Sequence, residues 1–249
     1  LTGAASASVV TGISNIFPWG VLNISDNIIR GNTSTATTAG FTGISNTGAI
    51  ATTINLNNNQ LGDGGANAIT FSAATSGAVL GISNTGGAAA SAISITGNSF
   101  TKFVHTVAGT SAHTYIINTA VCASLNISTN SFSNLVTNST GALNGITNIT
   151  AATNKTINAN NFSTITGGTG QLIMLNLGGG TTASAVTGNT INGITGGGGV
   201  TGISISALAA TSTVSGNTVS TMNTTGAGAP NVIGIQVQNA SVITGNTIS

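Results

Sequence analysis

Charged residues are almost absent from this sequence of 249 residues, and glutamate does not occur at all. A net charge of +1 provides no field that would attract a phosphate backbone or an anionic lipid surface. We therefore expect no nucleic acid as a partner. A surface with so little charge also gives little repulsion between copies, which favours self-association. The charged residues are Asp26, Arg30, Asp63, Lys102 and Lys155.

The shortage of acidic side chains argues against a polysaccharide-degrading enzyme. Glycoside hydrolysis generally needs two carboxylates that flank the scissile bond, and this sequence holds only Asp26 and Asp63. Asp26 precedes an asparagine of a repeated motif, whereas Asp63 lies in the glycine-rich segment LGDGG. In a repeat structure the two could meet one repeat apart, but aspartate is common in turns and we interpret both as turn residues. We predict no catalytic residue and no enzymatic activity.

Ligands for metals and cofactors are equally scarce. A calcium-binding solenoid needs one acid per repeat, which two acids cannot supply. Zinc needs three or four ligands, and His105 and His113 have no cysteine or carboxylate near them in the sequence. The four glycines 196–199 are not followed by the Lys-Ser/Thr pair of a phosphate-binding loop. We predict no metal and no cofactor.

A single cysteine, Cys122, excludes an internal disulfide. We interpret its thiol as a small buried hydrophobic group, because free cysteine usually behaves in this way. No apolar run is long enough to cross a membrane, so we predict no membrane insertion. The sequence begins at Leu1 rather than at a methionine, and we expect it to be a fragment of a longer chain.

The residues that are abundant indicate a folded all-β protein. Hydrophobic residues make up 40% of the chain, which is more than a disordered sequence carries. Val, Ile, Thr, Gly and Asn dominate and good helix formers are few, so strands are favoured over helices. The composition is uniform from end to end, which predicts one continuous body over residues 1–249.

A short motif recurs eight times: an apolar residue, two small or polar residues, an asparagine, one further residue and a second apolar residue. The asparagines are separated by 32, 39, 32, 30, 29, 28 and 29 residues. Repeats of this length are typical of solenoids, which tolerate insertions as loops. The eight asparagines are Asn27, Asn59, Asn98, Asn130, Asn160, Asn189, Asn217 and Asn246.

A second motif, glycine followed by an alternating apolar strand, keeps the same phase in six repeats and begins at Gly12, Gly43, Gly81, Gly145, Gly202 and Gly234. In the other two repeats Ile116-Ile117 and Met174-Leu175 take its place. Alternation at period two is the signal of a strand. With a third short strand between the motifs, each repeat forms one coil of three strands. We predict a right-handed parallel β-helix of about eight coils of roughly 28–39 residues, with no helices of note.

Stacked coils place equivalent residues above one another, so the repeats predict rows of side chains. The asparagines should form a ladder of amide hydrogen bonds, and the residue before each of them should turn a tight corner with left-handed backbone in at least five coils. The predicted aromatic stack is Phe100, Phe132 and Phe162. The predicted core row is Ile24, Leu56, Ile95, Ile127, Ile157, Val186, Val214 and Ile243.

The GNTI and GNTV cores, as in SGNTVS at 215–220 and TGNTIS at 244–249, resemble parallel β-helix repeats of pectate-lyase-like folds and of very long secreted surface proteins. The mixture of Thr, Asn, Gly, Ala and Ile with almost no charge resembles the repetitive bodies of giant cell-surface proteins of Bacteroidota-type bacteria. This resemblance implies an adhesin, a surface layer or a filament. It implies an extracellular or cell-surface location.

These observations lead to one expected function and two alternatives. We expect a structural component of an extracellular filament or cell-surface fibre, a rigid rod that self-associates end to end or laterally and possesses no active site. The segment Phe17-Pro18-Trp19 is a candidate contact between subunits. One alternative is a carbohydrate- or ice-binding solenoid with surface glycans as partners. A polysaccharide lyase or hydrolase is the less favoured alternative, because acids and bases are so few.

Overall fold

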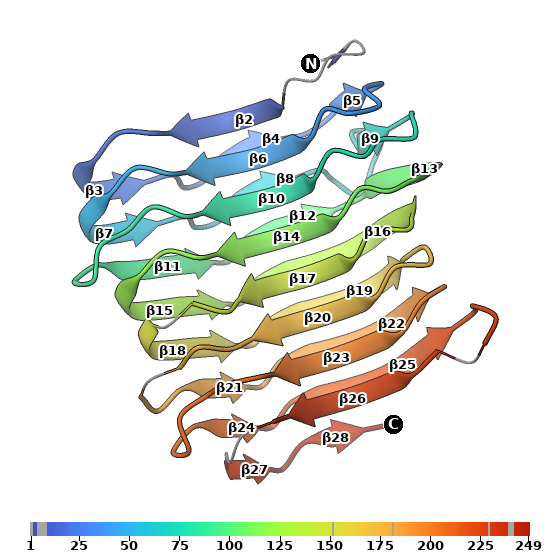
Figure 1. Cartoon of the computed structure of the whole chain (residues 1–249). Helices are drawn as coiled ribbons and strands as arrows, with labels where there is room; N and C mark the ends of the chain where they lie inside the picture. The colour runs from blue at the N-terminus through green and yellow to red at the C-terminus, as the bar shows by residue number, and fades with distance from the viewer. Residues whose placement is uncertain (1, 4–8, 151, 181, 229, 239–241) are drawn as a thin grey trace.

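The computed structural model is an all-β solenoid, and it describes residues 2–3, 9–150, 152–180, 182–228, 230–238 and 242–249. About eight coils stack from the N-terminal end to the C-terminal end, and every strand pairs in parallel with the strand of the next coil (Figure 1). In Figure 1 the front strands run to the left and the rear strands to the right while the chain descends, which makes each turn right-handed. The predicted parallel β-helix is confirmed.

Three sheets form the walls of the solenoid. The first sheet consists of β2 (Val10–Asn15), β6 (Phe41–Asn46), β10 (Val79–Asn84), β14 (His113–Asn118), β17 (Leu143–Asn148), β20 (Leu172–Leu177), β23 (Val200–Ile205) and β26 (Val232–Val237). The second sheet consists of β3 (Trp19–Asn23), β7 (Ile50–Asn55), β11 (Ala92–Thr96), β15 (Cys122–Ser128), β18 (Ala152–Asn158), β21 (Ala185–Thr187), β24 (Thr213–Ser215) and β27 (Val242–Thr244).

The third sheet is longer and less regular. Its 12 strands are β1 (Thr2–Gly3), β4 (Ile28–Ile29), β5 (Thr33–Ser34), β8 (Gln60–Leu61), β9 (Ile69–Phe71), β12 (Ser99–Thr101), β13 (Phe103–Gly109), β16 (Ser131–Ser139), β19 (Asn161–Thr166), β22 (Thr190–Gly196), β25 (Thr218–Thr224) and β28 (Thr247–Ile248). In the first three coils this wall is split into two strands, and from β16 onward one strand crosses it. The prediction of three strands per coil therefore holds for the later coils and misses the break in the early ones.

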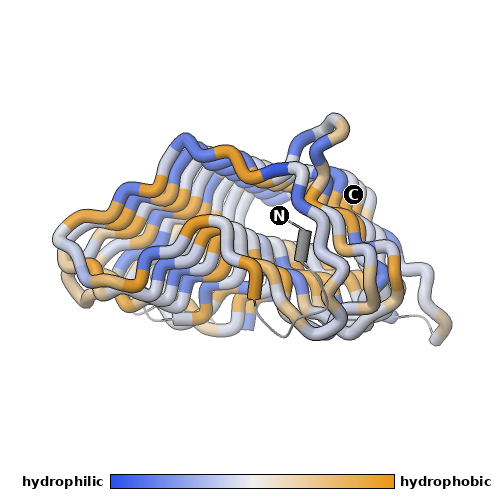
Figure 2. Tube along the Cα trace, turned by 90° about the horizontal axis from the view of Figure 1, so that it is seen from above, coloured by the Kyte–Doolittle hydropathy of each residue, from blue (hydrophilic) through white to orange (hydrophobic). Residues whose placement is uncertain are grey.

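The view along the axis shows why the coils stack (Figure 2). Hydrophobic positions recur at the same place in successive coils, so each coil covers the interior of its neighbour. The strand pairings join the predicted core row in register from Ile95 to Ile243. Its members are buried from Ile24 to Val214, and Ile243 in the last coil is 52% exposed.

The three predicted phenylalanines belong to a row of the third sheet whose members pair in register and face the interior. The rings of Phe100 and Phe132 stack with centroids 4.9 Å apart, and those of Phe132 and Phe162 stack at 4.4 Å. All three are fully buried. Stacked rings supply a large buried area and a favourable geometry. The full row is Ile29, Leu61, Phe100, Phe132, Phe162, Ile191, Val219 and Ile248.

The glycines of the second sequence motif lie in the first sheet, opposite this row. A methyl group on Gly81 would lie 2.5 Å from Cε1 of Phe100, and one on Gly145 would lie 2.3 Å from Cε1 of Phe162. Glycine is therefore required because a large side chain fills the space. The register corrects one assignment: Ile116 pairs with Ile82, so Tyr115-Ile116, and not Ile116-Ile117, replaces the Gly-Ile pair of that coil. Met174-Leu175 takes the predicted place, because Leu175 pairs with Ile146.

The corner before each ladder asparagine is left-handed in all eight coils, with φ between 53° and 66°. The expectation of at least five such corners is therefore confirmed and exceeded. Thr129 and Ala159 adopt this conformation despite its steric cost for residues with a side chain. The corner is thus imposed by the repeat and not by glycine alone. Its residues are Asp26, Asn58, Gly97, Thr129, Ala159, Gly188, Gly216 and Gly245.

Candidate functional site

The asparagine ladder is the most regular polar feature of the molecule, and its prediction is confirmed. In each step the backbone N–H and the Nδ2 of one asparagine both donate to Oδ1 of the asparagine in the following coil. The seven Nδ2 to Oδ1 distances are 2.9–3.0 Å, from Asn27 to Asn246. The seven N–H donors lie 2.9–3.1 Å from the same oxygens. Each step therefore joins two coils through side chain and backbone at once.

Each ladder asparagine after the first also bonds backward to the preceding coil. Nδ2 of Asn98 donates to the carbonyl of Leu56 at 2.8 Å, and Nδ2 of Asn130 donates to the carbonyl of Ile95 at 2.9 Å. The carbonyls belong to the core row, so the ladder fastens the same backbone that carries the apolar interior. Because these amides are buried from Asn59 to Asn217, their complete pairing is what makes a polar row tolerable in the interior.

A second amide ladder, which the sequence analysis did not identify, runs along the end of the first sheet. Nδ2 of Asn15 donates to Oδ1 of Asn46 at 2.8 Å, Asn46 to Asn84 at 2.7 Å, and Asn84 to Asn118 at 2.6 Å. Asn148 is the next residue of the row, and its Nδ2 donates to the carbonyl of Asn118 at 2.8 Å. The signal was an asparagine two residues after the isoleucine in four of the six Gly-Ile pairs, namely those that begin at Gly12, Gly43, Gly81 and Gly145.

This second ladder stops in the middle of the solenoid. Asn148 pairs with Leu177, and the row then continues with Ile205 and Val237. At the junction, Nδ2 of Asn118 and Oδ1 of Asn148 are buried without a hydrogen-bond partner. The corner between the first and second sheets is therefore polar inside in the early coils and apolar inside in the late ones.

The two acidic residues have different surroundings. Oδ2 of Asp63 lies 3.3 Å from Nη1 of Arg30, and its Oδ1 accepts the backbone N–H of Gly65 at 2.9 Å. The hydrogen bond from the Asn67 side chain is the main cause that lowers the pKa of Asp63 below its ordinary value. Asp26 turns a left-handed corner with φ of 61°. Among the described residues no hydrogen bond or ion pair joins these two carboxylates, and both have the turn geometry that the sequence predicted.

Lys155 lies in the interior, although a charged side chain is ordinarily expected at the surface. It pairs in register with Leu125 of the coil before, is 2% exposed, and donates from Nζ to the carbonyl of Gly178. Burial lowers the pKa of Lys155 to about 8, and the nearby Cys122 thiol partly opposes this effect. Cys122 is itself buried, as predicted, and burial raises the pKa of its thiol. Both shifts report that this part of the core is poorly solvated.

We expect Lys155→Met to raise the free energy of unfolding by about 1–3 kcal/mol at pH 7, because an ammonium group then no longer has to be buried. The advantage should shrink between pH 8 and 10.5, where native Lys155 has lost its proton but the unfolded chain has not. Guanidinium denaturation at several pH values measures both effects, with Lys102→Met at the surface as the matched control. A less stable Lys155→Met protein would show that the bond to Gly178 outweighs the cost of burial.

His105 and His113 are brought together at the corner between the third and fourth coils, and their ring nitrogens Nδ1 and Nε2 are 3.3 Å apart. They lie on β13 and β14, which belong to different sheets. No group of three or more His, Cys, Asp or Glu that could hold a metal occurs in the described part of the chain. The pair is fully buried, so it is not a site that a substrate reaches.

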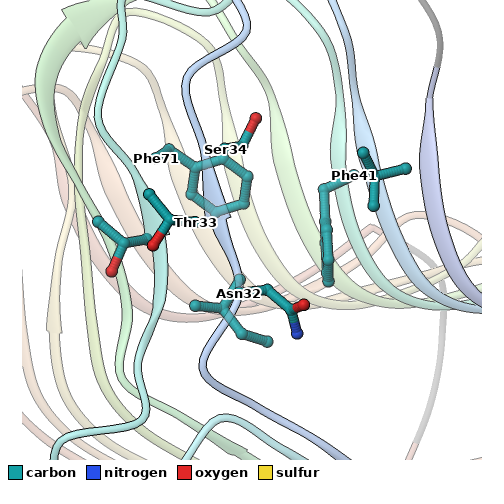
Figure 3. A pocket seen from close by; sticks show the side chains of 8 residues that line it. Asn32, Thr33, Ser34, Phe41 and Phe71 are labelled. Atoms are coloured by element: carbon teal, nitrogen blue, oxygen red, sulfur yellow. The ribbon is translucent and has the colours of Figure 1, made fainter. Parts of the chain in front are cut away.

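Hollows lie in the early coils and in the last coil. One has a volume of about 10 Å³ and lies beside Phe41, Phe71, Thr33 and Ser34 (Figure 3), which is room for about one water molecule. The other, of about 510 Å³, lies in the last coil and is lined by Ile235, Val237, Ile243, Thr244, Gly245, Asn246 and Ile248. Its apolar lining continues the core rows, so it is the open interior of that coil.

The outer face of the second sheet carries two parallel rows of small side chains. The row two residues before each ladder asparagine is polar in every coil: Ser25, Asn57, Thr96, Ser128, Asn158, Thr187, Ser215 and Thr244. The second row, two residues earlier, comprises Asn23, Asn55, Ser94, Asn126, Thr156, Ala185, Thr213 and Val242. Adjacent coils repeat at about 4.8 Å in any parallel sheet. The face is therefore a regular, uncharged lattice that consists mainly of hydroxyl and amide groups, with Ala185 and Val242 as the apolar members.

Comparison with known proteins adds no relative to this description. No family model matches the sequence, and neither a curated protein nor a solved structure shows significant similarity to it. A search for membrane-spanning helices found no candidate among the residues that the structure describes. The chain is thus defined by its class, a parallel β-solenoid with asparagine ladders.

Proposed function

We propose that this chain is a rigid, non-catalytic rod segment of an extracellular filament or cell-surface fibre, and that it self-associates. The observation that carries the proposal is the combination of a fully repetitive interior with an almost uncharged exterior. Side-chain rows and one amide ladder pass through all eight coils, while the five charged residues are too few to keep copies apart. Eight coils give a rod of only about 40 Å, so a fibre requires many such lengths.

The resemblance to giant surface proteins of Bacteroidota-type bacteria supports this proposal through composition alone. Two features suggest where contacts form. In the first coil Phe17 and Trp19 are 63% and 57% exposed. Large aromatic side chains such as these contribute strongly to binding at protein interfaces. In the last coil Ile243 and Ile248 are 52% and 62% exposed. Coils at either end can therefore accept a further coil, whether from the same protein or from another copy.

The proposal predicts that the purified chain assembles as its concentration rises. Sedimentation velocity should show growing species, and cryo-electron microscopy should show uniform rods with an axial repeat near 4.8 Å. Two sets of charged variants separate the modes of contact: Asn126→Lys with Thr156→Lys on the second-sheet face, and Val242→Lys with Thr247→Lys on the last coil. Each set should abolish only the contacts of its own surface. A protein that stays monomeric at millimolar concentration would contradict self-association.

The lattice on the second-sheet face favours a second candidate, a carbohydrate- or ice-binding solenoid. Rows of small hydroxyl and amide groups with a regular spacing suit a repetitive ligand, although this face mixes Ser, Asn and Thr. Thermal hysteresis and a glycan array test the candidate directly. Binding that disappears in the Asn126→Lys and Thr156→Lys variant would favour this function over a purely structural one.

A further inference from the structure

We propose that the cluster of His105, Ser111 and His113 is an acid-sensitive joint of the solenoid, at which protonation opens the corner between the third and fourth coils while distant coils keep their sheet hydrogen bonds. The proposal concerns regulation of the rod and does not depend on how copies associate.

The cluster bridges two walls at one corner. His105 lies on β13 of the third sheet, His113 begins β14 of the first sheet, and Ser111 lies in the turn between them. The Ser111 hydroxyl is 3.3 Å from Nδ1 of His105 and 3.2 Å from Nε2 of His113. All three residues are fully buried. This corner is thus held by contacts between two imidazole rings and a hydroxyl group.

The strand register shows that His113 occupies a position that is apolar in the other coils. His113 pairs with Val79 in the coil before and with Leu143 in the coil after. The complete row is Val10, Phe41, Val79, His113, Leu143, Leu172, Val200 and Val232, and only His113 can take up a proton. The position was therefore compatible with leucine or valine, and the fold itself does not require histidine there.

The hydrogen bonds determine where an added proton must go. Nε2 of His105 lies 3.1 Å from the carbonyl of Ala73, so it carries a hydrogen and leaves Nδ1 as the acceptor. We assign the bond between the rings as Nε2–H of His113 donating to Nδ1 of His105. The remaining free nitrogen is Nδ1 of His113, which is buried without a hydrogen-bond partner. A proton at that atom would create a buried cation whose N–H has no acceptor.

Among the residues that the structure describes, no opposite charge compensates that cation. The described groups packed around the pair are the rings of Phe71 and Tyr115, the hydroxyls of Thr137, Ser111 and Ser139, and the Ala73 carbonyl. Tyr115 is neutral, and burial raises its pKa further. Burial lowers the pKa of His113 to about 3 and lowers that of His105 below its usual value. Both histidines are therefore neutral in the folded protein near pH 7.

The direction of the pH effect follows from this. The unfolded or opened chain takes up protons near pH 6.5, whereas the closed corner resists them down to about pH 3 at His113. Below pH 6.5 the opened form binds more protons, so opening becomes more favourable as the pH falls. The opening constant should rise up to tenfold per pH unit for each histidine, and the effect should be absent above pH 7.

Hydrogen exchange of the full chain tests the proposal without any variant. After correction for intrinsic rates, protection of residues 105–118 should fall by at least tenfold between pH 7 and pH 5, while protection of residues 186–219 stays constant. If residues 105–118 keep the same protection at pH 5 as at pH 7, the proposal is wrong. A uniform loss over all coils would also overturn it, because protonation would then act on the whole fold.

Variants test the role of the histidines themselves. His113→Leu introduces the side chain that the same row carries at Leu143, and the acid-induced loss of protection should decrease at least tenfold at pH 5. Asn126 is an exposed residue of the fourth coil, and Asn126→Ala serves as the control. This variant should lose as much protection in acid as the original protein does. If His113→Leu and the original protein lose protection equally in acid, the cluster is not the sensor.

Discussion

Asn130→Ala is expected to lower the free energy of unfolding by about 3–5 kcal/mol, because it removes the centre of the main ladder. The substitution leaves the backbone N–H and Nδ2 of Asn98 without their shared acceptor, Oδ1 of Asn130. It also takes a donor from Asn160 and another from the Ile95 carbonyl. Each orphaned buried group costs about 1–3 kcal/mol. Guanidinium denaturation followed by circular dichroism measures the loss.

Two substitutions control this experiment. Asn126→Ala, four residues earlier on the exposed face, should change stability by less than about 0.5 kcal/mol. Asn246→Ala should cost less than Asn130→Ala, since Asn246 is only partly buried and ends the ladder, whereas Asn130 also donates to Asn160. Equal losses for Asn126→Ala and Asn130→Ala would show that the ladder does not stabilise the stack.

Phe132→Ala is expected to cost a similar amount, about 3–5 kcal/mol, because it opens a cavity between two stacked rings. Phe132 is fully buried between Phe100 and Phe162, and a solenoid core cannot collapse easily around a missing ring when the sheets hold their spacing. Thermal and chemical denaturation should both report the loss. The coils farthest from Phe132 should remain folded longest, since each repeat contacts mainly its neighbours.

Phe132→Ile separates volume from ring stacking. Isoleucine is the natural residue of this row at Ile191, so the backbone accepts it, and the loss should be clearly smaller than for alanine. If isoleucine and alanine destabilise the protein equally, the stacked geometry itself, and not the filled volume, contributes most of the stability.

The sequence predicts the part of this fold that repeats locally. The ladder asparagine, its flanking apolar residues and the corner before it lie within six consecutive residues, so eight copies make the pattern visible in spite of coils of unequal length. The left-handed corner at Thr129 and Ala159 was harder to foresee, because those residues do not favour it. There the stacking of neighbouring coils overrides local preference.

Features that depend on contacts between walls were not predictable in the same way. The second ladder changes from Asn148 to Leu177 midway, which hides its regularity in the sequence. His105 and His113 meet because the chain turns a corner between two sheets, and their separation of eight residues gives no indication of a 3.3 Å contact. Lys155 occupies an inward-facing position of its strand, whereas a charged residue ordinarily faces outward.

The shared direction of the amide bonds gives the rod a vectorial character. In both ladders every Nδ2 that reaches the next asparagine points toward the C-terminal end, and every Oδ1 that receives it faces the N-terminal end. An incoming coil therefore meets hydrogen-bond donors at one end and an acceptor at the other. Two like ends offer each other the same groups and cannot continue the ladder. Any extension that preserves the ladder must therefore be head to tail, with every coil in the same orientation along the whole rod.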